Sequence, residues 1–362
     1  MAWDLIVRRD DLAATTLVDV PVPDPEPGQV VLRGDRVGMT ANNVTYAVFG
    51  DAMRYWDFFP AADRDGVAQG RVPLWGFAVV ERSTVPEVAE GTRVYAYLPT
   101  SSHLVVEPVN VSPRGFRDGS AHRRELPAPY NGLTAVNADP AYDEDLEDLQ
   151  VLYRPLFMTS FVLVDFLTDN DCFGADTVVF TSASSKTAYG AAFLLDGVRR
   201  VGLTSDANRE FTESLGCWDE VVTYDDVERL APSSTVFVDV AGDAAVRRRV
   251  HERLDVVHSA VVGASHHDAA PEPPDAGDLP GAPPTFFFAP DQMRKRHADW
   301  GPDGVEERHA QAWARFAPVV AGWVDVVVGT GPEALRAAWL ETLAGDTPPR
   351  TGHVVELPPD GS

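Results

Sequence analysis

The spacing of apolar residues divides the chain into a β-rich part and a part in which strands and helices alternate. Up to about residue 125, short apolar runs are separated by proline and glycine, a pattern typical of the strands of a small irregular barrel. The runs are Val30–Leu32, Val79–Val80, Val94–Tyr97 and Leu104–Val106. Residues 126–150 are rich in proline, asparagine and acidic side chains and are expected to form a connector.

From Leu152 onward the pattern becomes helical. Residues 152–167 are apolar almost all round, which predicts a helix buried between two domains. Strands are then predicted at Thr177–Phe180, Val201–Leu203, Glu220–Thr223, Val236–Val240, Ser259–Val262 and Thr285–Phe288. Helices are predicted at Asn208–Leu215, Ala244–Leu254, Val305–Trp323 and Pro332–Ala344, before a last strand at His353–Leu357. Alternation at this spacing predicts a doubly wound parallel sheet, hence an α/β fold.

The segment Asp176–Leu195 joins a predicted strand to a predicted helix through a turn of small and hydroxyl residues. Such a turn holds a phosphate, because helix N–H groups and the positive end of the helix dipole both face the anion. With the strand that follows, it predicts a mononucleotide-binding βαβ unit and a nicotinamide cofactor. The candidate phosphate ligands are Ser184, Ser185, Lys186 and Thr187.

Helix capping is the competing interpretation of these hydroxyls. Capping does not account for Lys186, one of two lysines in the chain, because a cation is unfavourable at the positive end of a helix unless an anion is bound. A P-loop is excluded, since the glycines of that motif are absent.

The end of the second predicted strand carries Thr204, Ser205, Asn208 and Arg209. Sites for NAD usually place an acidic residue at this strand end to bind the ribose hydroxyls. Hydroxyls with a guanidinium suit a 2′-phosphate better, so NADP(H) is favoured over NAD(H). Asp206 is the counter-evidence, and a helix-capping role for Ser205 or Asp206 is the alternative.

Composition narrows the function classes. The 362-residue chain carries a formal net charge of −25, which argues against nucleic-acid binding. Two cysteines are too few for a disulfide framework or a thiolate metal site, and a cytoplasmic location is expected. No signal peptide and no membrane-spanning run is recognised. No serine-histidine-aspartate grouping is suggested by spacing, so a hydrolase is not indicated.

Several segments together resemble the medium-chain dehydrogenase/reductase superfamily, in particular its zinc-free quinone and enoyl reductases. Those segments are residues 23–43, 73–83, 88–99, 181–195, 215–224, 237–242 and 261–265. Within the superfamily, residues 42–51, 152–161, 182–188 and 286–296 are similar to an uncharacterised branch. The match covers nearly the whole chain.

The resemblance implies a GroES-like β-barrel domain at 1–150, a Rossmann domain at 151–315 and a segment, 316–362, that returns to the first domain. It also implies a homodimer formed by pairing of the Rossmann sheet edges through Thr285–Phe288. The family's zinc-dependent members have a His-Glu pair after the glycine that corresponds to Gly76. Phe77 and Ala78 follow here, and neither can ligate zinc, so no metal is expected.

The resemblance further assigns a site. Asn43 and Tyr46 fall where the family binds a substrate carbonyl, and Tyr46 could donate a proton. Nearby, Tyr55 and Trp56 could line the pocket. Further cofactor contacts are implied for Thr159, Tyr224, Gly263 and Ala264. The alternatives are local: Asn43 bonding the backbone of a turn, Thr159 bonding its own helix, and Tyr224 as an ordinary half-buried tyrosine.

The activity implied is zinc-independent hydride transfer from NADPH to an enone, a quinone or a similar conjugated carbonyl in a small-molecule substrate. The alternative is a protein of the same fold that binds NADP(H) or another ligand without turnover. The turn at 182–188 has Ser185, Lys186 and Ala188 where many relatives have glycine, and this keeps the second interpretation open.

Overall fold

The computed structural model describes residues 2–262 and 279–358, and these fall into two compact units. The barrel unit comprises Met1–Leu152 and Val324–Ser362, and the parallel-sheet unit comprises Tyr153–Trp323. The C-terminal segment belongs to the barrel unit because its strand β18 (Thr351–Glu356) pairs antiparallel with β3 (Val30–Met39). Strand β17 (Asp325–Thr330) pairs in parallel with β18 at the edge of the same sheet.

The barrel unit contains a three-stranded and a nine-stranded sheet among the described residues. The smaller has the order β2-β1-β4, and the larger the order β17-β18-β3-β5-β6-β10-β9-β8, with β7 paired to β3. The strands not yet bounded are β1 (Ala2–Arg8), β2 (Asp11–Val20), β4 (Gln69–Gly70), β5 (Pro73–Ser83), β6 (Arg93–Pro99), β7 (His103–Val106), β8 (Pro108–Ser112), β9 (Gly115–Asp118) and β10 (Gly132–Ala135). Helices α1 (Ala41–Val48) and α7 (Gly331–Ala344) complete this unit.

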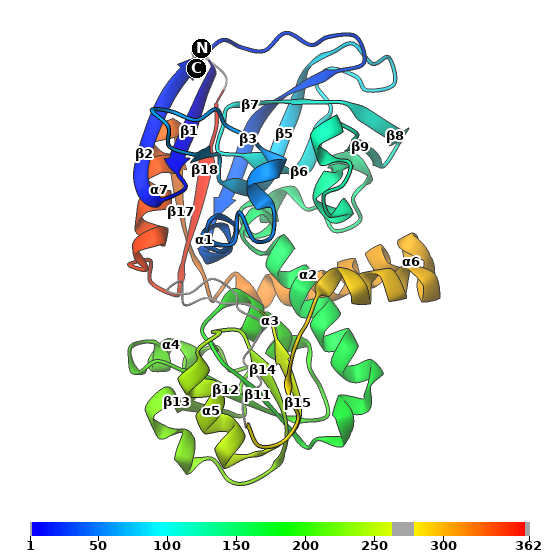
Figure 1. Ribbon diagram of the computed structural model, residues 1–362. Helices are drawn as coiled ribbons and strands as arrows, with labels where there is room; N and C mark the ends of the chain where they lie inside the picture. The colour runs from blue at the N-terminus through cyan, green and yellow to red at the C-terminus, as the bar shows by residue number, and fades with distance from the viewer. Residues whose placement is uncertain (1, 263–278, 359–362) are drawn as a thin grey trace. The chain divides into compact units, whose positions relative to one another are not determined.

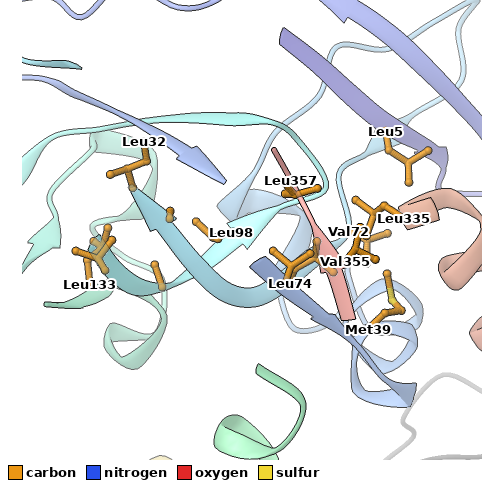
Figure 2. Close-up of a cluster of buried hydrophobic side chains, with 14 of the residues drawn as sticks. Leu5, Leu32, Met39, Val72, Leu74, Leu98, Leu133, Leu335, Val355 and Leu357 are labelled. Atoms are coloured by element: carbon orange, nitrogen blue, oxygen red, sulfur yellow. The ribbon is translucent and has the colours of Figure 1, made fainter. Parts of the chain in front are cut away.

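The apolar side chains of these strands form one core, to which α7 contributes Leu335 and Trp339. Figure 2 shows Leu335 close to Leu5 and Val72, so the last helix packs on strands from the start of the chain. Distant parts of the barrel unit are thus joined by apolar packing. Gly38 of β3 also lets the backbone at Val151 come close, since a Cβ atom on Gly38 would lie 2.5 Å from the Val151 carbonyl oxygen.

The parallel-sheet unit has a six-stranded sheet of order β13-β12-β11-β14-β15-β16, with every recorded pairing parallel. Its strands are β11 (Thr177–Phe180), β12 (Arg199–Thr204), β13 (Glu220–Thr223), β14 (Ser234–Asp239), β15 (Asp255–Val261) and β16 (Pro284–Phe286). The helices are α2 (Glu147–Asp169, which starts in the barrel unit), α3 (Lys186–Leu194), α4 (Arg209–Ser214), α5 (Ala244–Arg253) and α6 (Ala289–Val320) (Figure 1). This is the predicted doubly wound sheet, with its order reversing between β11 and β14.

The α/β fold class, with a GroES-like barrel and a Rossmann sheet, is confirmed, but several elements differ from the sequence prediction. The hairpin of β1 and β2 and the strand β17 were not predicted. Helix α6 begins at Ala289 rather than Val305, and its helical geometry is interrupted at Gly301, where φ is +72°. The first half of this helix was not predicted, because the glycines and proline at 301–304 indicate a break in a helix.

Within the described residues, one helical stretch, Glu144–Asp169, is long and apolar enough to cross a membrane. Half of its most apolar window is buried inside the protein, which is also the behaviour of a core helix. Its Tyr153, Phe157 and Leu163 are fully buried. The stretch therefore fits the core helix expected from its all-round apolar pattern.

Candidate functional site

The turn between β11 and α3 is the feature on which the predicted cofactor site depends. It is built without glycine: Ser182 has φ of +52°, a left-handed conformation that non-glycine residues rarely adopt. The Ser185 amide donates to the Ser182 carbonyl at 2.8 Å, and the Ser185 hydroxyl accepts from the Ala188 amide at 3.3 Å. Ser185 is therefore the N-cap of α3, as the capping interpretation held.

Side chains from neighbouring strands hold this turn in place. The Tyr224 hydroxyl accepts from the Ser182 amide at 3.0 Å. The Thr181 hydroxyl donates to Asp239 at 2.9 Å and accepts from the amides of Val240 and Ala241. Asp239 is buried and forms an ion pair with Arg247, its Oδ2 lying 2.8 Å from Nη2. The turn is thus braced at the carboxyl ends of β11 and β14, where the strand order reverses.

Lys186 starts α3 and is half-buried. Its ammonium lies 5.7 Å from the centre of the Tyr153 ring, in cation–π contact. Tyr153 in turn hydrogen-bonds Tyr189, with 2.5 Å between their hydroxyl oxygens. Burial lowers the pKa of Lys186 from its ordinary 10.5 to about 8. The charged form is therefore destabilised here, and an anion at the helix start would restore it.

The loop after β12 approaches the same turn. Asn208 Nδ2 donates to the Ser184 hydroxyl at 3.3 Å, which joins the two predicted cofactor loops. Thr204 is buried at the strand end, and Ser205 makes no side-chain cap bond to the short 3₁₀ turn that follows. Arg209 is exposed and pairs with Glu213 one helical turn later, Nε to Oε1 being 2.8 Å. Asn208 and Ser184 are thus brought together, whereas Arg209 lies on the outer face of α4.

Four further predicted cofactor residues either have local hydrogen bonds or lie outside the described residues. The Thr159 hydroxyl donates to the Pro155 carbonyl at 3.1 Å, so it bonds back to its own helix as the local alternative held. The Thr187 carbonyl accepts from Ser160 at 2.8 Å, which ties α3 to α2. Gly263 and Ala264 lie outside the described residues.

In the barrel unit, Asn43 and Tyr46 lie on α1. Asn43 Oδ1 accepts from the Thr40 amide at 2.7 Å, while Nδ2 donates to the Pro73 carbonyl at 2.8 Å. The amide therefore caps α1 and anchors it to β5, as the local interpretation held. The Tyr46 hydroxyl accepts from Trp75 Nε1 at 3.0 Å, and burial raises the pKa of this phenol well above its ordinary value. Tyr46 consequently stays protonated and able to donate at neutral pH.

The two aromatic residues predicted to line the pocket behave differently. Tyr55 is half-buried, with its ring centre 4.8 Å from that of Tyr46. Trp56 is 1% exposed and belongs to the main core, where a Cβ on Gly50 or Gly70 would collide with its indole. Trp56 is therefore a core residue rather than a pocket wall, because Gly50 and Gly70 leave room for its indole.

Replacing Trp56 by alanine is expected to destabilise the protein by about 3–5 kcal/mol, the usual cost of deleting a fully buried large aromatic side chain. Urea unfolding followed by circular dichroism measures the change. A loss below about 1 kcal/mol, the size expected at a surface site, would contradict the core assignment. Arg54→Ala, at an exposed neighbouring position, is the matched control.

Sequence reasoning missed the residues that complete the surroundings of Tyr46. Trp75, Tyr97 and Tyr130 all have ring centres within 6.2 Å of another ring of this group, and Tyr46 packs edge-on against both tyrosines. Trp75 directly precedes Gly76 in a segment used for the family resemblance, which was a usable signal. Tyr130 comes from the connector after residue 125, where nothing in the sequence singles it out.

A hydrogen-bonded chain of serine, histidine and glutamate also occurs in the barrel unit, although spacing did not suggest one. The Ser102 hydroxyl lies 2.8 Å from His103 Nδ1, and His103 Nε2 lies 2.9 Å from Glu81 Oε2. Ser102 is buried, and its hydroxyl accepts from the Trp3 amide at 2.9 Å. The Ser102 hydroxyl thus holds β1 by a hydrogen bond and is buried. This serine-histidine-glutamate series therefore does not present an accessible nucleophile for hydrolysis.

Metal ligation was not expected, and among residues 2–262 and 279–358 no cluster of three or more histidine, cysteine, aspartate or glutamate side chains could hold an ion. At the position of the family's zinc ligands, Phe77 is buried in the barrel with the Arg93 guanidinium 4.5 Å from its ring centre. The residues at this position therefore serve packing.

The chain belongs to a protein family described as a protein of unknown function, DUF2855, whose model matches residues 37–348. No curated protein matches its sequence.

Solved structures share its fold over almost the full length of both chains. CurA from Vibrio vulnificus in complex with NADPH is 16% identical, with a TM-score of 0.64 and 99% of each chain covered. The yhdH oxidoreductase from Salmonella enterica in complex with NADP is 16% identical, with a TM-score of 0.57 and coverage of 99% of this chain and 100% of that one. The quinone oxidoreductase from Thermus thermophilus is 16% identical, with a TM-score of 0.55 and coverage of 98% of this chain and 100% of that one. The chain therefore has the two-domain fold of the medium-chain dehydrogenase/reductase superfamily.

Proposed function

We propose that this protein is a zinc-independent, NADP(H)-dependent reductase that transfers hydride to an enone, a quinone or a similar conjugated carbonyl. The observation that carries the proposal is the braced turn at the start of α3, with a half-buried lysine whose pKa is lowered to about 8 by burial. A bound phosphate would stabilise the charged form of this lysine. Proteins of the same fold have been crystallised with NADPH or NADP.

The residues present fit a dinucleotide. The amide groups of the first turn of α3 have no partner within the helix and point along its axis, as helix starts do in general. Ser184, Ser185 and Thr187 add hydroxyls, and Lys186 adds the charge. The Ser182 amide is already bonded to Tyr224, so we assign the pyrophosphate to the helix start rather than to the turn itself. Ser205 and Asn208 then lie on the loop assigned to the 2′-phosphate, with Arg209 on α4 next to it.

When bound, NADPH would supply the hydride. The chain itself must hold the substrate oxygen and deliver the proton. We assign both tasks to Tyr46, whose buried phenol stays protonated at neutral pH and can donate a hydrogen bond to a developing enolate oxygen or a proton to the α carbon. Asn43 positions α1, because both ends of its amide are engaged with the backbone. Tyr55, whose ring centre lies 4.8 Å from that of Tyr46, would be the neighbouring contact for the substrate.

Titration of the purified protein with NADPH, followed by addition of a panel of enones and quinones, tests the proposal. We expect NADPH fluorescence to change on binding and absorbance of the reduced nicotinamide to fall with at least one panel member. Binding without oxidation of NADPH across the panel would favour a non-catalytic NADP(H) sensor. Absence of binding would overturn both assignments.

We also propose a cytoplasmic homodimer formed through β16. Phe286 on this strand is 57% exposed, and β16 pairs with β15 alone among the strands of the described residues. An open apolar edge of this kind favours pairing with a second copy. Phe286→Asp is expected to convert the dimer to a monomer in light scattering, while Val109→Asp, at an exposed valine of the barrel unit, leaves it intact. A wild-type monomer would contradict the proposal.

A further inference from the structure

The indole of Trp75 donates a hydrogen bond to the Tyr46 hydroxyl. The distance from Trp75 Nε1 to the Tyr46 oxygen is 3.0 Å. An indole N–H can only donate, so the Tyr46 oxygen is the acceptor in this bond. The proton of the phenol therefore points away from the indole, which leaves Tyr46 able to donate to another group.

A second hydrogen bond joins the same helix to the same strand. Asn43 precedes Tyr46 by about one turn of α1, and Pro73 precedes Trp75 by two residues on β5. Residues at these spacings share one face of a helix and one face of a strand. Asn43 Nδ2 donates to the Pro73 carbonyl at 2.8 Å. Helix α1 thus contacts β5 at two points, and the second bond holds the phenol and the indole in register.

Packing fixes the orientation of the indole. Trp75 is half-buried and stacks on Tyr95, with 5.6 Å between ring centres and an angle of 14° between the ring planes. Its ring centre also lies 5.0 Å from that of Tyr97, its partner across the pairing of β5 with β6. A phenylalanine could make such ring contacts, but it has no N–H to donate. The hydrogen bond to Tyr46 is therefore the property that distinguishes tryptophan at this position.

We propose that Trp75 is a positioning residue for Tyr46: its N–H orients the phenol as a donor and stabilises the phenolate that forms when Tyr46 gives up its proton. This role rests on the reductase function proposed above. After hydride has reached the β carbon of a conjugated carbonyl, the Tyr46 O–H bond breaks and its electron pair stays on the oxygen. The proton forms a C–H bond at the α carbon of the enolate, and water then returns a proton to Tyr46. The indole N–H bonds the charged oxygen more strongly than the neutral one.

The three tyrosines in ring contact with Tyr46 stay uncharged at neutral pH. Tyr55, Tyr97 and Tyr130 have ring centres 4.8 to 6.2 Å from that of Tyr46, and they form an aromatic cluster with it. Burial raises the pKa of each of these phenols. Tyr46 itself is 5% exposed, and a hydrogen bond is electrostatically stronger in such surroundings than in water. Loss of the Trp75 N–H is therefore expected to raise the pKa of Tyr46 and to weaken it as an acid.

A titration followed by ¹⁹F NMR tests the role of Trp75 without any substrate. Trifluorotyrosine is placed at position 46, because its phenol is more acidic than that of tyrosine and ionises at a lower pH. Trp75→Phe is expected to raise the midpoint of this titration by about one pH unit or more, since a charged oxygen loses a hydrogen bond.

Tyr97→Phe is the matched control for this titration. Its hydroxyl has no hydrogen-bond partner within the described part of the chain, and the phenylalanine ring keeps the contact with Tyr46. The midpoint is therefore expected to stay at the wild-type value. An unchanged midpoint in Trp75→Phe, or an equal rise in Tyr97→Phe, would overturn the role assigned to Trp75.

Kinetics distinguish positioning from packing. With NADPH and 2-cyclohexen-1-one as probe, Trp75→Phe is expected to lower kcat about tenfold. Replacement of Trp75 by 3-benzothienylalanine, which has sulfur in place of the N–H and keeps the shape of the ring, gives the same loss. In a Tyr46→Phe background Trp75→Phe has no further effect, because Trp75 acts through the phenol. A further loss in that background, or full activity with the benzothiophene ring, would assign Trp75 to packing and overturn the proposal.

The two measurements separate this proposal from the reductase function. A raised midpoint in Trp75→Phe, together with no NADPH oxidation by any panel member in the wild type, would support the action of Trp75 on Tyr46 and overturn the reductase. An unchanged midpoint, together with NADPH oxidation by the wild type, would overturn the role of Trp75 and support the reductase.

Discussion

Tyr46→Phe lowers the rate of conjugated-carbonyl reduction by about 100- to 10,000-fold, the range expected when a general acid is removed. The phenylalanine ring keeps the packing against Tyr55, Tyr97 and Tyr130, so the fold is expected to be unchanged. What is lost is the hydroxyl, which is enclosed and protonated at neutral pH. Oxidation of NADPH, followed by absorbance with the most reactive panel member, measures the effect.

The affinity for NADPH separates this loss from a binding defect. In Tyr46→Phe the dissociation constant of NADPH stays at the wild-type value, because Lys186 and the turn before α3 belong to the other unit. Tyr97→Phe, which removes a hydroxyl from the same cluster, keeps a rate near that of the wild type. A less than threefold loss in Tyr46→Phe would show that the proton comes from elsewhere.

Lys186→Ala weakens NADPH binding by about 1–3 kcal/mol, which corresponds to roughly a 5- to 150-fold larger dissociation constant. The reason is the charge at the start of α3. Burial lowers the pKa of Lys186 to about 8, so at neutral pH most molecules still carry Lys186 in its charged form. A bound phosphate would stabilise this ammonium further. Fluorescence titration with NADPH at pH 7 measures the change, with circular dichroism to verify that the fold is intact.

The pH dependence of binding makes this assignment specific. A phosphate that interacts with the ammonium binds the protonated form more tightly, so wild-type affinity is high below pH 8 and falls as the pH rises through about 8. Lys186→Ala is expected to lose this fall. Lys186→Arg keeps its charge at every pH of the titration and therefore retains affinity above pH 8. The same fall in Lys186→Ala as in the wild type would place the titrating group outside the turn.

The parallel sheet could be predicted because most of its strands contain a short apolar run between polar segments. Thr177–Phe180 and Glu220–Thr223 begin and end where the sequence indicated. The turn after β11 was equally visible, since small and hydroxyl residues separate a strand from a helix. Such features are local in sequence, and local patterns are what a single sequence reveals.

The other elements depend on contacts between distant segments. Strand β17 has the alternation of neither a strand nor a helix, with Val327 and Val328 both exposed, and it forms because β18 pairs with it. Trp56 was predicted to line a pocket, and its core position becomes clear only when Gly50 and Gly70 are seen next to its indole. Tyr130 joins Tyr46 only after the connector folds against β6. These placements come from tertiary packing, which residue spacing does not encode.

The buried ion pair between Asp239 and Arg247 has a consequence for how a nucleotide would be received. Through Thr181 it fastens the ends of β11 and β14 to each other before anything binds. The conformational entropy that a loose loop loses on contact with its ligand is here lost during folding instead. Association would then proceed with little rearrangement of the backbone, and its rate would be governed by diffusional encounter rather than by loop closure.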